Sequence, residues 1–190
     1  MSILSLEFLL LAACTVLLYY LLPLRIRWAV LLAASVVYVG LSGWYSAAHL
    51  TTVALVMWGG GLLLERKRSG LMLALLVGLD MSAMLLLKYA PSRFTQELLV
   101  PVGLSYFTFQ SAGYLVDVYR GKVRAQKNPL WAWLFVGYFP QLAQGPISTW
   151  KELGPQLITG HRLKPEQFGS GFTLLLWGYF KKLVIADRLA

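Results

Sequence analysis

A polar stripe inside an apolar segment is the first candidate for chemistry in this sequence. Gln110, Tyr114 and Asp117 recur at intervals of four and three residues, so a helix would place them on one face. Such a face turns toward water or other polar groups, because polar side chains are costly against lipid. A buried structural seam, in which Asp117 and Arg120 can pair, is the favoured reading, and a functional lining is the alternative.

Further charges lie inside apolar runs. Asp80 falls in the middle of one, and an intramembrane carboxylate marks a functional site unless it has a structural partner. No second acid or histidine stands beside it to form a proton relay. A hydrogen bond to a hydroxyl, amide or cation is therefore the favoured reading of Asp80. Lys181 and Lys182, with Asp187, lie in the last apolar segment and are predicted to face a cavity or a partner.

A proline-broken segment follows the stripe. Residues 130–140 are apolar and aromatic, but as a helix they would reach only about half the bilayer thickness. The next residues combine helix breakers with two amides and are candidate lining residues: Pro140, Gln141, Gln144, Gly145 and Pro146. Because both flanks are basic, we predict a re-entrant loop buried in protein. A helix lying along the membrane surface is the alternative.

Other enzyme signatures are absent from the sequence. The glycine triplet 59–61 lacks the spacing of a phosphate-binding loop, and 169–171 lacks that of a nucleophile elbow. No histidine, cysteine and carboxylate residues have the spacing of a metal site. His49 and His161 are expected to be surface or interface histidines rather than bases.

The N-terminus offers two readings. Residues 11–14 resemble a lipoprotein cleavage box, but no cation precedes Arg25, so we predict a retained first helix. Cys14 is the single cysteine, which leaves no internal disulfide.

The composition places these residues in a membrane. Hydrophobic residues make up 58% of the 190 positions and charged residues 13%, which leaves too little polar surface for a soluble domain. We predict an all-α polytopic membrane protein with about five to seven membrane-embedded helices, including a re-entrant segment. The expected helices before that segment are 5–24, 28–41, 49–64, 71–87 and 98–119, and a last apolar segment covers 168–190.

Basic clusters orient the expected helices. Arg25 and Arg27, residues 66–68 and residues 120–127 are basic, whereas the turn at 42–45 is uncharged. The positive-inside rule makes the clusters cytoplasmic and the N-terminus external. This pattern accounts for the net charge of +9 without a nucleic-acid partner and indicates membrane lipid instead.

Three blocks, spaced in order along the chain, resemble the membrane-bound O-acyltransferase (MBOAT) family, and in particular its bacterial polysaccharide branch. The first reads PVGLSYFTFQ at 101–110 and continues as YLVDVYRG at 114–121. The second reads YFPQLAQGPI at 138–147 and the third GYFKKLVIAD at 178–187. The resemblance covers the whole chain and identifies residues 1–190 as the N-terminal part of a single transmembrane domain of this family.

The resemblance implies a function and a setting. Family members fold as many helices around a central funnel in the bacterial plasma membrane. They transfer an acyl group, here expected to be acetyl, from a cytoplasmic carrier or acyl-CoA to hydroxyls of an exported polysaccharide or cell-envelope glycan. No bound cofactor is implied. The implied partners are the acyl donor, the glycan acceptor and a periplasmic or extracellular acyltransferase.

The family's catalytic histidine, usually preceded by tryptophan, has no counterpart, since the sequence contains no Trp-His pair. We therefore assign no catalytic residue to this chain and expect it to be inactive alone. The candidate residues named above are expected to line the funnel. A non-catalytic membrane scaffold that binds a partner is the alternative function. A transporter, suggested by Asp80 and the broken helices, is a weaker one.

Overall fold

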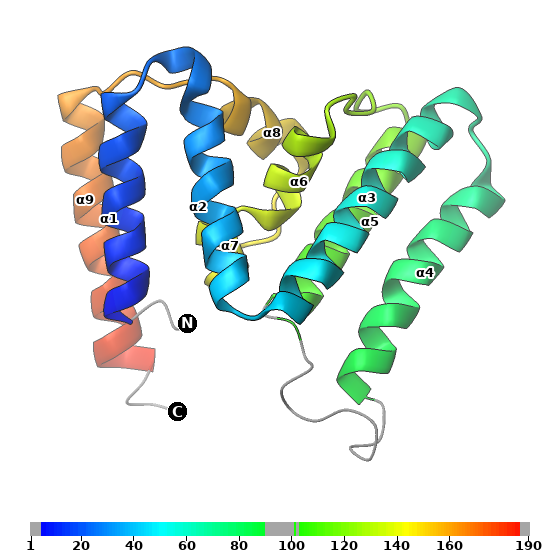
Figure 1. Cartoon of the computed structure of the whole chain (residues 1–190), viewed down its shortest axis with the longest axis horizontal. Coiled ribbons are helices and arrows are strands. Elements are labelled where there is room, and N and C mark those ends of the chain that lie inside the picture. Colours follow the sequence, from blue (N-terminus) through cyan, green and yellow to red (C-terminus); the bar gives the residue numbers. More distant parts are fainter. Residues whose placement is uncertain (1–4, 90–100, 102, 187–190) are drawn as a thin grey trace. The chain divides into compact units, whose positions relative to one another are not determined.

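The computed structural model describes residues 5–89, 101 and 103–186, and these residues form helices without any strand. The chain divides into two units, Met1–Gly160 and His161–Ala190. The first unit contains α1 (Leu6–Leu21), α2 (Arg27–Leu41), α3 (Trp44–Arg66), α4 (Gly70–Tyr89), α5 (Leu104–Tyr119), α6 (Pro129–Gly137), α7 (Phe139–Gln144) and α8 (Trp150–Ile158) (Figure 1). The second contains α9 (Pro165–Phe180), which continues into a π-helical turn, Lys181–Ala186. The predicted all-α class is confirmed.

The helix ends differ from the expected ones for local reasons. α1 stops at Leu21, not at residue 24, because the backbone becomes extended ahead of Pro23, which cannot continue a helix. α3 begins at Trp44, five residues earlier than expected, since Gly43 adopts a φ of 111° and turns the chain there. α5 begins at Leu104; residues 98–100 of the expected helix lie outside the described residues.

The helices are apolar enough for a membrane. Among the described residues, three candidate spans are long and apolar enough to cross it: Leu24–Leu41, Trp44–Arg66 and Gly70–Tyr89. α1 and α5 have 16 residues each, about 24 Å of helix, and are somewhat shorter than the ~30 Å hydrocarbon core. α4 exposes a row of leucines: Leu71, Leu75, Leu79 and Leu86. Such a face is stable only against lipid or further helices, as predicted for a polytopic membrane protein.

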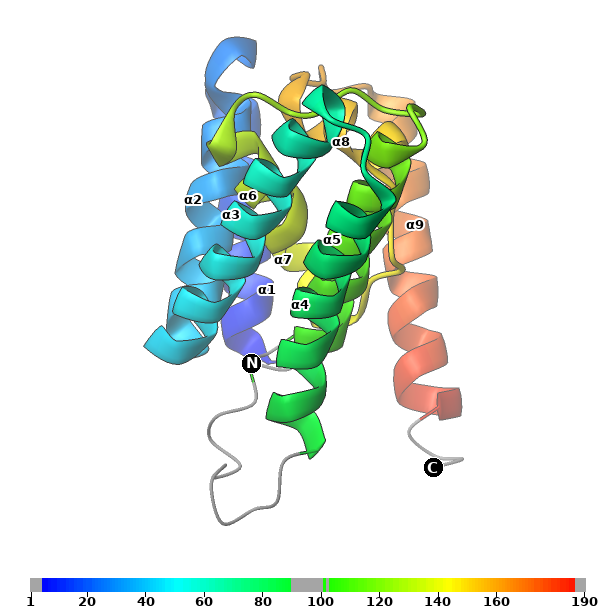
Figure 2. The ribbon, with the colours of Figure 1, turned by 90° about the vertical axis from the view of Figure 1, so that its right-hand side faces the viewer.

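Close packing of α3 against its neighbours gives the glycine triplet a structural role. A Cβ atom added to Gly61 would lie 2.9 Å from Cε1 of Tyr114 on α5. A Cβ added to Gly60 would lie 2.8 Å from Cδ1 of Leu76 on α4. Small residues let helix backbones approach in this way in membranes. Figure 2 shows α3, α4 and α5 as neighbouring, similarly inclined helices.

Helices α6 and α7 enter between α2, α3 and α5. Nε1 of Trp58 donates to the carbonyl of Lys127 at 3.2 Å, and Nε1 of Trp133 donates to Oγ1 of Thr51 at 3.1 Å. Lys127, just before α6, thus contacts Trp58, whereas Trp133 within α6 contacts Thr51, which lies earlier on α3. α6 therefore runs antiparallel to α3, toward the N-terminal end of α3. This is the end opposite the basic turns.

The chain then returns to the end at which it entered. Residues 145–149 lead back to α8, whose start lies near the top of Figure 1. Just after α8, Gly160 meets the turn between α1 and α2, where an added Cβ would lie 2.6 Å from the carbonyl oxygen of Leu24. Gly121, before α6, would similarly meet Arg68. The chain therefore enters and leaves this segment at the same end of the helices, as predicted for a re-entrant loop. We call the end that carries these turns the basic end.

Arg27 departs from the expectation of a solvated loop cation. It is the first residue of α2 and is buried. Its Nε donates to the carbonyl of Leu22 at 2.9 Å, its Nη2 donates to that of Tyr20, and its guanidinium lies 5.1 Å from the Tyr19 ring centroid. The side chain thus caps the C-terminus of α1, where carbonyls lack helical partners.

Candidate functional site

The predicted stripe on α5 faces the re-entrant loop. Gln110 and Tyr114 are each only 1% exposed, while Asp117 nearer the basic end is partly exposed. Tyr106, one turn before Gln110, extends the stripe toward the start of α5. Phe107, which lies near Tyr114 on the helix surface, is also buried, so the stripe belongs to the side of α5 that packs within the protein.

Gln141 connects the stripe to the returning chain. The Tyr106 hydroxyl donates to Oε1 of Gln141 at 2.6 Å, and Nε2 of Gln141 donates to Oγ of Ser148 at 2.8 Å. Both ends of the carboxamide are thereby oriented. The first and second sequence blocks, far apart in the chain, meet through this side chain.

Gln110 is buried next to the Tyr106 hydroxyl. Neither its Nε2 nor its Oε1 has a hydrogen-bond partner of good geometry among the described residues. An unpaired buried amide destabilises the fold by roughly 1–3 kcal/mol. Such groups are rare in native structures and are retained where a ligand or water uses them. Gln110 therefore offers two donors and two acceptor lone pairs beside the re-entrant loop.

Tyr114 ties the loop after α5 to the aromatic packing around α8. Its hydroxyl accepts the backbone N–H of Gln126 at 2.7 Å. Its ring packs edge-on against Trp150, with centroids 5.7 Å apart, and Trp150 packs on Phe135 of α6 at 5.0 Å. These contacts hold the start and the end of the re-entrant loop against one helix.

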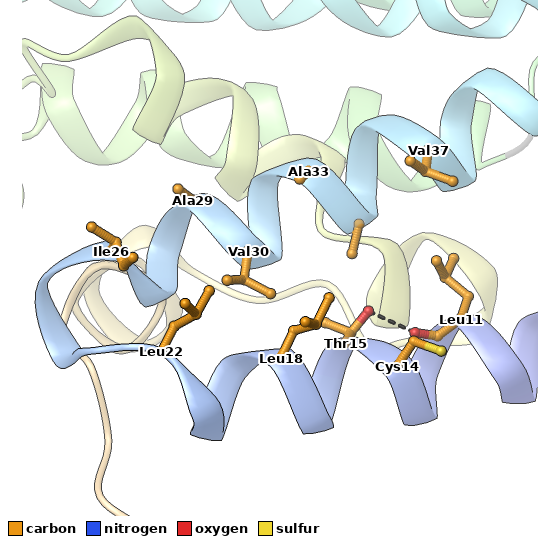
Figure 3. A pocket seen from close by; sticks show the side chains of 11 residues that line it. Leu11, Cys14, Thr15, Leu18, Leu22, Ile26, Ala29, Val30, Ala33 and Val37 are labelled. Carbon is orange, nitrogen blue, oxygen red and sulfur yellow. Dashed lines mark hydrogen bonds between the residues drawn. The ribbon is translucent and has the colours of Figure 1, made fainter.

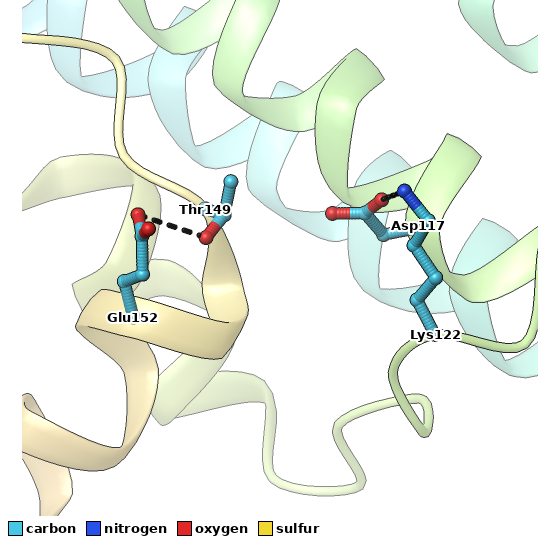
Figure 4. A network of polar contacts seen from close by, with 4 residues as sticks. All are labelled: Asp117, Lys122, Thr149 and Glu152. Carbon is cyan, nitrogen blue, oxygen red and sulfur yellow. Dashed lines mark hydrogen bonds and ion pairs between the residues drawn. The ribbon is translucent and has the colours of Figure 1, made fainter.

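Asp117 pairs with Lys122, not with Arg120 as the sequence spacing suggested. The Nζ–Oδ1 distance is 3.8 Å, and the lysine side chain is 59% exposed (Figure 4). Gly121, with a φ of 70°, reverses the chain and brings Lys122 back toward the helix. An exposed pair at this distance contributes little to stability. At the start of α8, the hydroxyl of Thr149 donates to Oε2 of Glu152 at 3.0 Å, which fixes the helix entry.

The remaining loop residues shape the backbone. Pro140 occupies the first turn of α7, where its missing N–H leaves no bond unmade. Gly145 ends α7; its N–H donates to the carbonyl of Gln141, and an added Cβ would lie 2.6 Å from Cα of Gln141. Pro146 is exposed on the returning segment, and Gln144 is the last residue of α7. The structure thus places these candidates around Gln141.

Asp80 has a structural partner. It is 3% exposed, and the hydroxyl of Ser111 on α5 donates to its Oδ2 at 2.6 Å. The hydrogen bond to a hydroxyl is therefore present, and it joins α4 to the apolar side of α5. Asp80 does not lie on the Gln110 stripe.

Lys181 and Lys182 belong to the second unit and occupy its π-helical turn. Nζ of Lys181 lies 5.3 Å from the ring of Trp177, and Lys182 also has an interaction within the protein. A cation over an indole face is stabilised even in an apolar setting. Asp187 lies outside the described residues.

The two histidines differ. His49 lies in the second turn of α3, its ring packs on Phe107 at 5.6 Å, and its buried Nε2 has no partner in the described part of the chain. His161 is exposed. No group of three metal-ligating side chains occurs in the described residues.

Sequence reasoning missed three residues of the site: Tyr106, Ser148 and Trp150. The spacing of four residues between Tyr106 and Gln110 was a usable signal. The other two lie beyond Pro146, where no periodic pattern continues.

An apolar cavity of about 420 Å³ lies between α1 and α2 (Figure 3). Its lining contains the hydroxyl of Thr15 and the thiol of Cys14, and the hydroxyl donates to the carbonyl of Leu11 within its own helix. This cavity offers no group for acid–base chemistry.

Comparison with known proteins finds relatives whose names describe O-acetylation. Proteins named alginate O-acetylase AlgI from Azotobacter vinelandii and Pseudomonas putida are 30% and 32% identical to the chain over 91% of its length. A peptidoglycan O-acetyltransferase from Helicobacter pylori is 32% identical over half of the chain. No family model matches the chain, and no solved structure matches it.

The matched regions cover 39% and 40% of the two alginate relatives, so the chain spans about two fifths of their length. These relatives confirm the resemblance to the MBOAT family that the three sequence blocks indicated.

Proposed function

Because the chain is homologous to alginate O-acetylases over 91% of its length, we propose that it is part of a membrane-bound O-acyltransferase. The complete protein transfers an acetyl group to hydroxyls of an exported polysaccharide or another cell-envelope glycan. That homology is the observation that carries the proposal. The contact between the first two sequence blocks, through Tyr106 and Gln141, supports it.

In this proposal the stripe and the re-entrant loop form a wall of the funnel that holds the acceptor. Gln110 supplies the unused hydrogen-bonding groups that a sugar hydroxyl needs, and Gln141 is held in place beside it. The residues of this chain bind and orient the acceptor. Such positioning contributes several kcal/mol to catalysis.

The general base is assigned to a segment outside residues 1–190. This chain has no Trp-His pair, and His49 lies against Phe107 with its Nε2 buried. The chain alone should therefore transfer no acyl group. The acyl donor, a carrier or acyl-CoA, approaches from the cytoplasm, and a periplasmic or extracellular acyltransferase is the proposed protein partner.

The basic end is proposed to be cytoplasmic. The turns around Arg25, Lys67 and Lys122 lie together there, as the positive-inside rule requires. We propose that the protein lies in the bacterial plasma membrane with its N-terminus outside.

A chimera tests the function. Residues 1–190 replace the matching region of the Pseudomonas putida relative in a strain lacking its own enzyme, and acetyl ester on exported alginate is measured. We expect the chimera to restore ester formation and the 1–190 chain alone to give none. A well-inserted chimera without activity would favour a scaffold; activity of residues 1–190 alone would show that the base lies within them.

A matched pair of substitutions tests the role of Gln110. Gln110→Leu should lower acetylation in the chimera at least about 10-fold while leaving the fold as stable or more so, because it removes an unpaired buried amide. Gln156→Leu, which alters an exposed amide on α8, is the control and should leave acetylation unchanged. Equal activity of both variants would remove Gln110 from the acceptor wall.

A further inference from the structure

A second cavity opens at the basic end, between the last turn of α3 and the loop that leads into α6. Its volume is about 570 Å³. Its lining residues are Glu65, Arg124, Ala125, Gln126, Lys127, Asn128 and Trp131. None of them belongs to the α5 stripe, so the cavity is a separate feature of the first unit.

The cavity carries two cations without acidic partners. Arg124 and Lys127 are exposed, and neither forms an ion pair with a carboxylate of the described residues. Glu65 lines the same cavity, but its Oε1 accepts the backbone N–H of Ala125 at 3.2 Å instead. The lining therefore has two positive charges and one negative charge, and its excess positive charge attracts an anion.

The loop that presents these cations is fixed in place. The N–H of Gln126 donates to the Tyr114 hydroxyl, and the N–H of Asn128 donates to Oε1 of Gln126 at 2.9 Å. Trp58 holds the carbonyl of Lys127. A loop ordered before binding loses little conformational entropy when a ligand arrives.

Trp131 adds an unused donor. Its Nε1 is buried and has no acceptor among the residues that the structure describes. Its ring packs edge-on against Trp28, with centroids 6.1 Å apart. A buried indole N–H normally finds an acceptor. The cavity thus combines two cations with the aromatic ring of Trp131 in its lining.

We propose that this cavity binds a phosphate ester with a single negative charge, held by Arg124 and Lys127 beside the ring of Trp131. Arginine matches phosphate oxygens with paired donors, and lysine adds a point charge. Because the lining carries one excess positive charge, a phosphodiester fits it better than a dianionic phosphate. The volume is in the range of small-molecule sites. Such a diester reaches the basic end either on a lipid headgroup or on a soluble molecule.

Binding to the purified chain in non-ionic detergent tests the proposal without any acyl transfer. Native mass spectrometry measures binding of phosphatidylglycerol, and calorimetry measures binding of glycerophosphoglycerol, which has the same headgroup without acyl chains. Binding of the lipid alone identifies the membrane as the source, and binding of the soluble diester alone identifies a soluble ligand. Binding of both shows that the headgroup is sufficient. Binding of neither overturns the proposal.

Three variants locate the site. Arg124→Gln with Lys127→Gln should weaken binding roughly 30-fold, about 5-fold for each cation. Trp131→Phe keeps an aromatic ring in the lining and should leave binding within about 2-fold of the parent chain. Glu65→Gln should strengthen binding by a few fold, since it removes the negative charge from the lining.

Arg66→Gln with Lys67→Gln is the control, because it removes the same two charges at the same end but outside the cavity lining. It should change binding less than about 3-fold, because only general attraction is lost. The proposal is overturned if this control loses as much affinity as the Arg124 and Lys127 variant, or if that variant binds like the parent chain.

Discussion

Gly103→Ala should detach α7 from the start of α5. Gly103 precedes α5 with a φ of 74°, in the left-handed region, where an alanine is disfavoured by about 1–2 kcal/mol. The added Cβ would also lie 2.7 Å from Cδ2 of Leu142 and 3.2 Å from its carbonyl oxygen. The leucine tip can move but the carbonyl cannot, so overpacking adds about 1–3 kcal/mol. The expected destabilisation is about 2–5 kcal/mol.

The assay is the thermal midpoint in mild detergent, followed by tryptophan fluorescence. For a chain of this size, each kcal/mol corresponds to about 2–4 °C, so the midpoint should fall by roughly 5–15 °C. Gly113→Ala is the control in the same helix. It has open space around its Cβ position and should raise the midpoint, because alanine favours helix over glycine by about 1 kcal/mol.

A double-mutant cycle separates the two contributions. In a Leu142→Ala background, Gly103→Ala should lose only the contact with the leucine tip and retain both the contact with the carbonyl oxygen and the left-handed part of about 1–2 kcal/mol. If Gly103→Ala melts like Gly113→Ala, then α7 does not pack on Gly103 as described.

Three further outcomes are expected. Ser111→Ala removes the donor to Asp80 and should cost about 1–3 kcal/mol, seen as a lower thermal midpoint; an unchanged midpoint would mean that the carboxyl group is satisfied elsewhere. Tyr106→Phe removes a single hydrogen bond to α7 and should lower the free energy of unfolding by about 1 kcal/mol. It should also increase thiol labelling of a cysteine placed in the returning segment, and labelling equal to that of the parent would count against the hydrogen bond between Tyr106 and Gln141. Single cysteines replacing the exposed Trp44 and Lys67, with the native cysteine removed, should label from opposite sides of intact cells, and labelling from one side would refute the orientation.

The re-entrant loop was predictable because its signals are local. Pro140, Gly145 and Pro146 break a run too short to span, and backbone groups freed in this way must be covered by protein. The face shared by Gln110 and Tyr114 was also predictable, because it follows from helical periodicity alone.

The pairing of side chains was not predictable, because it depends on tertiary geometry. Asp117 is separated from Arg120 by a favourable helical spacing, yet the left-handed turn at Gly121 presents Lys122 instead. Tyr106 and Gln141 are 35 residues apart, and only the docking of α7 brings them together. Arg27 was expected to be a loop cation, because the sequence does not show that its side chain caps the C-terminus of the preceding helix.

The partners of the re-entrant loop have a consequence for how the protein is made. Ser35, Thr51 and Tyr106, which bond to groups of α6 and α7, are synthesised earlier than these helices, whereas Ser148, the other partner of Gln141, follows them. Ser35 illustrates this, because its hydroxyl accepts the N–H of Phe139 while donating to the carbonyl of Leu31. When the ribosome reaches residue 140, the helices that carry Ser35 and Thr51 have therefore left the exit tunnel, and Tyr106 follows them. Insertion of this segment thus follows helix assembly and needs no recognition by the translocon as a span of its own, so slowed translation just after α5 should favour its correct placement.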